Sequence, residues 1–133
     1  MIGCEKYKKV VFIDDDRDLV ELYNKDLQKK HLSDYLICFD NASEGISFLK
    51  EAKKNELPDY ILLDLYMPEM DGFEFLENVD KIKKIKDSVE IYVCTVSKKE
   101  EDRKKVMKFP FVSAFMEKPL ESDFLEFLIK EEI

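Results

Sequence analysis

Five side chains that can bind cations or phosphate stand at the ends of short apolar runs in this sequence. Asp14 and Asp15 follow the first run and Asp64 follows the third, while Thr95 ends the fourth and Lys118 comes after the fifth. Carboxylate oxygens and phosphate are the ligands that Mg²⁺ prefers in proteins. A lysine and a hydroxyl can neutralise or bind phosphoryl oxygens, and an aspartate can accept a phosphoryl group as an acyl phosphate. These residue types therefore suit metal-assisted phosphoryl transfer, provided that the fold brings them together.

The apolar runs that must position these side chains are short and rich in β-branched and aromatic residues. They cover residues 10–13, 35–39, 60–63, 91–95 and 112–117. Because the runs are apolar throughout, we predict strands that are buried on both faces. The stretches between and after them are charged and amphipathic, which predicts helices at residues 18–30, 42–53, 73–80, 98–107 and 123–132. This alternation favours an α/β fold, a doubly wound three-layer sandwich with a parallel sheet of five βα units.

Two of the expected helices carry features that bear on a site. Asn41 or Ser43 is expected to cap the second helix. The fourth, residues 98–107, is almost entirely charged and has only Val106 and Met107 as an apolar stripe. We therefore expect this helix to be solvated and weakly anchored, which suits an element that moves.

The carboxyl ends of parallel strands meet at one edge of a sheet, so the three aspartates should converge there. Clustered carboxylates oppose each other's ionisation, and a bound Mg²⁺ would relieve this repulsion. Asp15 and Asp64 could ligate the metal directly and Asp14 could act through water. Taken singly, an acidic residue after a strand is more often a helix cap or a loop residue; it is the combination at one edge that predicts a site.

Composition and charge limit the classes of function. The chain has 133 residues, the length of a single domain, and a net charge of -8 that argues against non-specific binding to nucleic acid. No apolar run approaches the length of a membrane span or a secretion signal. Cys4, Cys38 and Cys94 include no C-x-x-C pair and are interpreted as reduced thiols of a cytoplasmic protein. Residues 1–8 are interpreted as a short N-terminal extension, and no output domain is expected.

The segment from Pro58 to Gly72 resembles the phosphoacceptor block of response-regulator receiver domains. It contains the motif D-x-x-M-P-x-x-D-G, beginning at Asp64, and the sequence also has the acidic pair, the strand-end threonine and the Lys-Pro pair of that family. The resemblance extends from Lys9 to the C-terminus and is closest to single-domain, CheY-like regulators. It implies the flavodoxin-like strand order 2-1-3-4-5.

The resemblance also implies a role for each residue at the expected site. Asp64 would be phosphorylated with Mg²⁺ as cofactor, and Lys118 would contact the phosphoryl group. Asp14 and Asp15 match the acidic pocket of the family. Asp15 and the backbone carbonyl of Tyr66 would contact the metal together with Asp64.

Further residues match positions that control switching and rates in the family. Thr95 matches the switch hydroxyl and Phe115 the switch aromatic, which act on the face formed by the last two helices and the strand between them. Tyr66 and Ser97 occupy the variable positions that tend to set the lifetime of the phosphorylated state. Val96 departs from the small residue usual in the family, and we expect its stiff side chain to slow phosphoryl chemistry.

The resemblance implies a signalling domain with at most self-phosphorylation and self-dephosphorylation activity. Its partners would be a histidine kinase or histidine phosphotransfer protein and a downstream target protein. Direct DNA binding and membrane binding are not expected, and homodimerisation on phosphorylation stays open. Two alternatives remain: a pseudo-receiver that binds proteins without phosphorylation, and an aspartate-nucleophile phosphohydrolase. The second usually has a D-x-D-x-T motif, and the sequence after Asp64 lacks its second acid.

Overall fold

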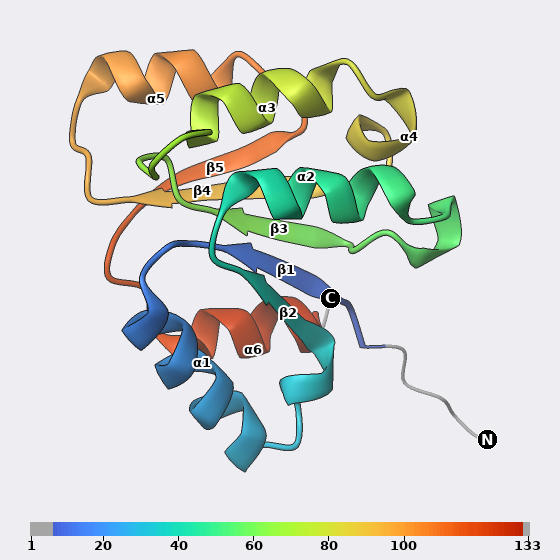
Figure 1. Ribbon diagram of the computed structural model, residues 1–133. Helices are drawn as coiled ribbons and strands as arrows, with labels where there is room; N and C mark the ends of the chain where they lie inside the picture. Colours follow the sequence, from blue (N-terminus) through green and yellow to red (C-terminus); the bar gives the residue numbers. More distant parts are fainter. Residues whose placement is uncertain (1–6, 132–133) are drawn as a thin grey trace.

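A parallel five-stranded sheet forms the middle layer of the computed structural model, which describes residues 7–131 (Figure 1). The strands are β1 (Val10–Ile13), β2 (Leu36–Phe39), β3 (Tyr60–Leu63), β4 (Glu90–Thr95) and β5 (Val112–Glu117). Their order is β2-β1-β3-β4-β5, so the expected flavodoxin-like α/β fold is confirmed. The interpretations placed on Cys4, on residues 1–6 and on residue 132 lie outside the described part of the chain.

Helices cover both faces of the sheet. They are α1 (Arg17–Lys29), α2 (Ala42–Glu51), α3 (Gly72–Asp80), α4 (Lys83–Lys86), α5 (Glu100–Met107) and α6 (Ser122–Lys130), with short 3-10 helices at Ser33–Tyr35 and Lys54–Glu56. Figure 1 shows α2, α3, α4 and α5 on one face and α1 and α6 on the other. The sequence did not predict α4, because four residues are too few to show a helical period. None of the helices in residues 7–131 has the length and apolar character needed to cross a bilayer.

Side-chain caps fix where the helices next to the site begin. Asp16 caps α1 by accepting a hydrogen bond from the backbone N–H of Leu19 at 3.1 Å. Asn41, and not Ser43, caps α2. Asp71 and Glu74 form a reciprocal capping box at the start of α3. The loops that carry Asp15 and Asp64 are therefore closed by defined helix starts.

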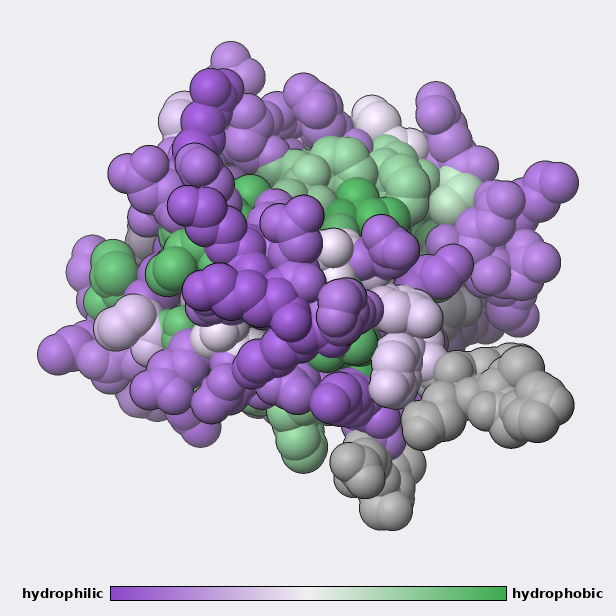
Figure 2. All heavy atoms as spheres, turned by 90° about the horizontal axis from the view of Figure 1, so that it is seen from below, coloured by the Kyte–Doolittle hydropathy of each residue, from purple (hydrophilic) through white to green (hydrophobic). Residues whose placement is uncertain are grey.

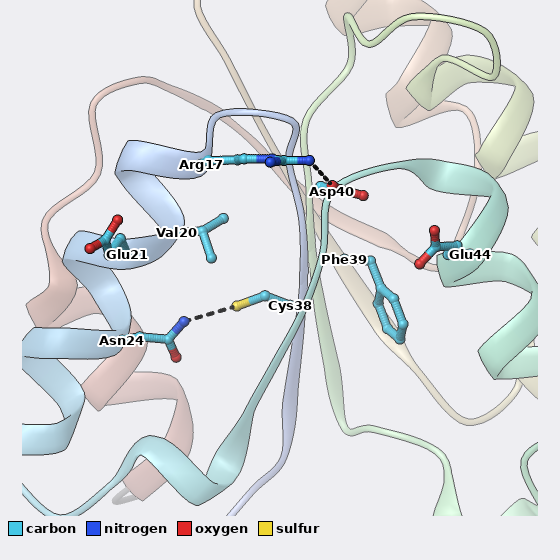
Figure 3. Close-up of a pocket in the computed structure, with 8 residues that line it drawn as sticks. All are labelled: Arg17, Val20, Glu21, Asn24, Cys38, Phe39, Asp40 and Glu44. Carbon is cyan, nitrogen blue, oxygen red and sulfur yellow. Dashed lines mark hydrogen bonds and ion pairs between the residues drawn. The ribbon is translucent and has the colours of Figure 1, made fainter.

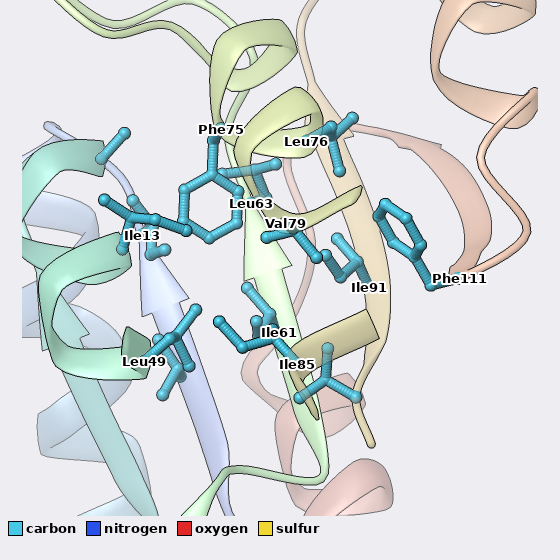
Figure 4. Close-up of a cluster of buried hydrophobic side chains, with 14 of the residues drawn as sticks. Ile13, Leu49, Ile61, Leu63, Phe75, Leu76, Val79, Ile85, Ile91 and Phe111 are labelled. Carbon is cyan, nitrogen blue, oxygen red and sulfur yellow. The ribbon is translucent and has the colours of Figure 1, made fainter. Parts of the chain in front are cut away.

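The larger core cluster lies between the sheet and α2, α3 and α4 (Figure 4). Phe75, Leu76 and Val79 of α3 are fully buried against strand residues such as Ile61 and Ile91. Every residue of β1 and β3, two of the three inner strands, is buried, as predicted. In the third, β4, Tyr92 is only partly buried and Glu90 is exposed. The same prediction was wrong for β2 and β5, which are only partly buried because they form the two edges of the sheet.

The opposite face packs through a second cluster on α1 and α6. Figure 2 views the molecule from this side and shows a mainly hydrophilic surface with separate hydrophobic patches. Leu22 on α1 and Phe127 on α6 are among the exposed large hydrophobic residues. Scattered exposed residues of this kind are normal for folded proteins.

Candidate functional site

Backbone hydrogen bonds between neighbouring strand ends bring the expected site residues to one edge of the sheet. The N–H of Asp14 donates to Phe39 O at 3.1 Å, and the N–H of Asp64 donates to Ile13 O at 3.0 Å. At the other side, the N–H of Lys118 donates to Thr95 O at 2.9 Å. The side chains of these residues therefore emerge at the carboxyl ends of adjacent strands, where open parallel sheets bind ligands.

The three aspartates form one cluster at this edge. Asp14 is fully buried, Asp64 is 7% exposed and Asp15 is exposed. One carboxylate oxygen from each lies within 4.8 Å of the others, close enough to share a metal ion. All three ligands are hard oxygens and one of them opens to solvent, so the residues fit Mg²⁺, which commonly keeps water in its coordination shell.

Lys118 supplies the positive charge inside the cluster. Its Nζ lies 2.6 Å from Asp14 Oδ2 and 3.4 Å from Asp64 Oδ1. The other oxygen of Asp14 accepts a hydrogen bond from the N–H of Asp16 at 2.9 Å. Burial lowers the pKa of Lys118, but its hydrogen bond to Asp14 and the nearby carboxylates raise it on balance. Lys118 is therefore a fixed cation that also points toward Asp64.

Asp64 has an unusual affinity for protons in the metal-free protein. Burial, and then repulsion from Asp14, raise its pKa from 3.8 to about 6, although Lys118 opposes the shift. The folded protein therefore holds a proton on Asp64 over a pH range in which the unfolded chain has released it. Ionisation of Asp64 therefore lowers the free energy of unfolding, and this loss grows as pH rises from about 4 to about 6.

We expect Asp64→Asn to be more stable than the wild type by about 3 kcal/mol at pH 7 in a buffer that contains a chelator. The difference should shrink as pH falls and disappear below about pH 3, because the wild-type carboxyl is then protonated in both the folded and the unfolded state. Denaturant unfolding of the two proteins at several pH values measures the difference. A constant difference from pH 4 to pH 7 would contradict the assigned titration.

Thr95 and Phe115 lie on neighbouring strands on the α3 and α5 side of the sheet. Thr95 is fully buried, and its Oγ1 accepts a hydrogen bond from the N–H of Ser97 at 3.2 Å. Phe115 pairs with Val93 in the sheet and is partly buried against the larger core cluster. In contrast, Val96 is 71% exposed and so is not held by core packing.

Asp102 was missed by the sequence analysis, which expected its helix to be solvated. It lies in the first turn of α5 and is 6% exposed. Its Oδ2 accepts hydrogen bonds from the hydroxyls of Ser97 and Tyr66, the two positions expected to set rates. These hydrogen bonds, the one from Ser97 first, lower the pKa of Asp102. Its spacing of four residues from the buried Val106 was the signal that could have placed it on the inner side of the helix.

A separate pocket of about 420 Å³ lies beside β2, between α1 and α2 (Figure 3). Arg17 and Asp40 form an ion pair of 3.1 Å at this pocket, and the side chain of Asn24 reaches Cys38. Burial raises the pKa of the Cys38 thiol to about 11, so the thiol is protonated at neutral pH. The pocket therefore offers neither the acidic cluster nor a reactive thiolate.

Comparison with known proteins connects this arrangement to one family. The family model of the response regulator receiver domain matches residues 10–130. The probable C4-dicarboxylate response regulator DctR of Bacillus subtilis is 35% identical over 100 residues, which cover 74% of this chain and 40% of that protein. The chemotaxis protein CheY of Halobacterium salinarum is 28% identical, with 76% of this chain and 77% of that protein covered.

Solved structures share the fold at lower identity. A two-component response regulator from Cytophaga hutchinsonii superposes with a TM-score of 0.77 at 22% identity, covering 95% of this chain and 96% of that one. The chemotaxis protein CheY4 of Vibrio cholerae gives a TM-score of 0.74 at 21% identity, covering 94% of this chain and 98% of that one. These similarities agree with the observed strand order of the sheet.

Proposed function

The chain belongs to the response-regulator receiver family of two-component signal transduction, and on this basis we propose that Asp64 accepts a phosphoryl group from a histidine kinase or a histidine phosphotransfer protein. The observation that carries the proposal is the position of the Lys118 ammonium between the carboxylates of Asp14 and Asp64. An incoming phosphoryl group at Asp64 would meet a cation that is already held in place.

In this reaction an oxygen of the Asp64 carboxylate bonds to phosphorus and the P–N bond of the phosphohistidine breaks. The histidine nitrogen leaves with the bonding electrons and takes up a proton, and an acyl phosphate remains on Asp64. Lys118 orients and neutralises a phosphoryl oxygen, and the hydroxyl of Thr95 can donate to another. The protein's contribution is thus mainly positioning and charge stabilisation.

Mg²⁺ is the proposed cofactor, held by Asp15, Asp64 and the backbone carbonyl of Tyr66, with Asp14 acting through water. When bound, the metal would neutralise part of the charge that the phosphoryl group adds to the acidic cluster. The proximity of the three carboxylates supports this assignment. The chain's own part is to keep Asp14 paired with Lys118, which leaves Asp15 and Asp64 available.

Signalling is proposed to proceed through Thr95 and Phe115. Thr95 would move toward the phosphoryl oxygens and Phe115 would turn further inward, which reshapes the face formed by α5, β5 and α6. A ligand shifts such an equilibrium only by binding the two states differently, and the phosphoryl group does so through Thr95. The altered face would then be read by a partner protein, and exposed Val96 would slow the approach of the phosphoryl donor.

Phosphorylation should be confined to Asp64. We expect incubation with acetyl phosphate and Mg²⁺ to add one phosphoryl group to the wild type and none to Asp64→Asn, because the variant lacks the nucleophilic carboxylate. Intact-mass spectrometry and peptide mapping measure the adduct and its site. Equal labelling of the variant would refute the assignment, and absence of labelling in the wild type would favour a pseudo-receiver.

Magnesium affinity should depend on Asp15 and not on Asp16. Asp15→Asn is expected to weaken Mg²⁺ binding by about tenfold or more, since it removes one charged ligand. Asp16→Asn is the matched control, because asparagine also caps helices well and should leave α1 intact. Calorimetric titration of both variants with Mg²⁺ gives the affinities. Similar losses in both variants would mean that the assigned ligand set is wrong.

A further inference from the structure

Asp102 is a buried charge on a helix with little other anchorage. Within α5, only Asp102 and Val106 are buried. A buried carboxylate is costly unless hydrogen bonds compensate for the lost water. The partners of Asp102 are therefore a large part of what holds the start of α5 against the rest of the protein.

Both partners come from the loops that flank Asp64. Tyr66 is two residues after Asp64 in the loop that follows β3, and Ser97 is two residues after Thr95 in the loop that follows β4. The Ser97 hydroxyl donates to Asp102 Oδ2 at 2.6 Å, and the Tyr66 hydroxyl donates to the same oxygen. One carboxylate oxygen thus joins the two loops across the carboxyl edge of the sheet.

The hydrogen bonds that link Tyr66 and Ser97 through Asp102 form a bridge, and each of these two partners makes a further contact. The N–H of Ser97 donates to Thr95 Oγ1 at 3.2 Å, so the same residue contacts the expected switch hydroxyl. On the other side, the ring of Tyr66 makes an edge contact with Phe73 at the start of α3, with centroids 6.1 Å apart. The half-exposed Tyr66 ring is therefore fixed at both ends, by its backbone next to the site and by its hydroxyl on α5.

We propose that Asp102 is a positioning residue that holds Tyr66 and Ser97 where they limit the access of water to phosphorylated Asp64. This inference rests on the proposed phosphorylation of Asp64. In hydrolysis a water oxygen bonds to phosphorus and the bond from phosphorus to the Asp64 oxygen breaks. The products are the free carboxylate and inorganic phosphate, and the surplus proton of water goes to phosphate or solvent. Without Asp102 the Tyr66 ring is free to rotate away, which opens the approach for that water.

The test compares rates of dephosphorylation. The proteins are loaded with acetyl phosphate and Mg²⁺, the donor is removed, and phosphate release is followed. We expect Asp102→Ala to hydrolyse about tenfold faster than the wild type, the effect of losing one to two hydrogen bonds to a charged group. Asp102→Asn should be intermediate, because its amide oxygen can still accept. Glu101→Gln, an exposed neighbour on the same helix, should hydrolyse at the wild-type rate.

A double-variant comparison separates the bridge from a general effect on α5. Tyr66→Phe keeps the ring but removes its hydroxyl, so it should accelerate hydrolysis much as Asp102→Ala does. If the two residues act through one bridge, the double variant should be no faster than the faster single variant. Additive effects of the two substitutions would overturn the proposal.

Tyrosine ring NMR signals of the unphosphorylated proteins report on the bridge itself. The ring signals of Tyr66 should shift in Asp102→Ala and keep their positions in Glu101→Gln. Slow amide exchange in β1 and β3 of both variants, as in the wild type, would show that their core is intact. Failure of the wild type to take up phosphate would overturn the proposed function and the role of Asp102 with it. Normal uptake with equal hydrolysis in Asp102→Ala and wild type would overturn only the role of Asp102.

Discussion

Replacing Lys118 by methionine is expected to destabilise the protein by about 3–5 kcal/mol in the absence of divalent cations. The side chain of Asp14 is fully buried, and Lys118 is its ion-pair partner at 2.6 Å. Methionine keeps most of the side-chain volume but leaves Asp14 and Asp64 without their cation. Removing one partner of a buried ion pair costs far more than the pair contributes, because the remaining charge is left uncompensated.

Two additions make this prediction specific to charge. Millimolar Mg²⁺ should restore part of the lost stability, since an ion that binds only the folded state stabilises it by mass action. The double variant Lys118→Met with Asp14→Asn should be more stable than Lys118→Met alone. Denaturant unfolding with and without Mg²⁺ measures all three proteins. If neither Mg²⁺ nor the second substitution recovers stability, the destabilisation of Lys118→Met would be due to lost packing and not to the lost charge.

Lys83→Met is the matched control, because it removes an ion pair with the same short distance between its charges but in an exposed position. Lys83 lies 2.6 Å from Asp87, as close as Lys118 lies to Asp14, but its side chain is 85% exposed. Water screens this pair, so its removal should lower the free energy of unfolding far less than the loss of Lys118 does. A large loss in this variant would show that burial is not what makes Lys118 important.

Gly72→Ala is expected to lower the free energy of unfolding by about 3 kcal/mol and to impair phosphorylation. A Cβ atom at Gly72 would lie 2.7 Å from the backbone oxygen of Asp64 and 2.7 Å from Cα of Leu65. These atoms belong to the backbone of the loop that follows β3 and carries Asp64. The N–H of Gly72 also donates to Leu65 O in this loop at 2.7 Å. Because no flexible side chain can yield, the loop itself has to shift.

Gly45→Ala provides the comparison within the same protein. A Cβ atom there would also approach another atom to 2.7 Å, but that atom is the terminal Cδ1 of Ile13, which can move. Alanine is also favoured over glycine in a helix by about 1 kcal/mol, so the net change should stay within about 1 kcal/mol. Thermal unfolding and acetyl phosphate labelling of both variants test the prediction. Equal losses in the two variants would contradict it.

The sequence predicted the fold well because its signals are local and repeated. Each inner strand is a continuous apolar run, and each longer helix shows its own periodicity, so the order of elements could be predicted from neighbouring residues alone. The residues of the acidic edge could be named because each follows such a run directly. Their grouping followed from a general property of parallel sheets and needed no side-chain detail.

What could not be predicted depends on contacts between distant residues. Partial burial of β2 and β5 follows from their edge positions, which the runs themselves do not show. Asp102 stands in a charged stretch where its neighbours are solvated, and its burial depends on hydroxyls 36 and 5 residues away in the sequence. The pairing of Lys118 with Asp14 could not be predicted either, because several carboxylates lie at the same edge of the sheet and the sequence does not show which of them Lys118 contacts most closely.

The strand order also has a consequence for synthesis of the protein on the ribosome. Asp14 and Asp64 leave the ribosome well before Lys118, and the Lys118–Asp14 contact joins residues 104 positions apart. A nascent chain that already contains β1, β2 and β3 therefore carries the acids without the lysine that neutralises them. The edge of its partial sheet stays strongly negative until β5 emerges and docks against β4. Completion of the sheet is thus coupled to the arrival of the one positive charge that directly follows β5.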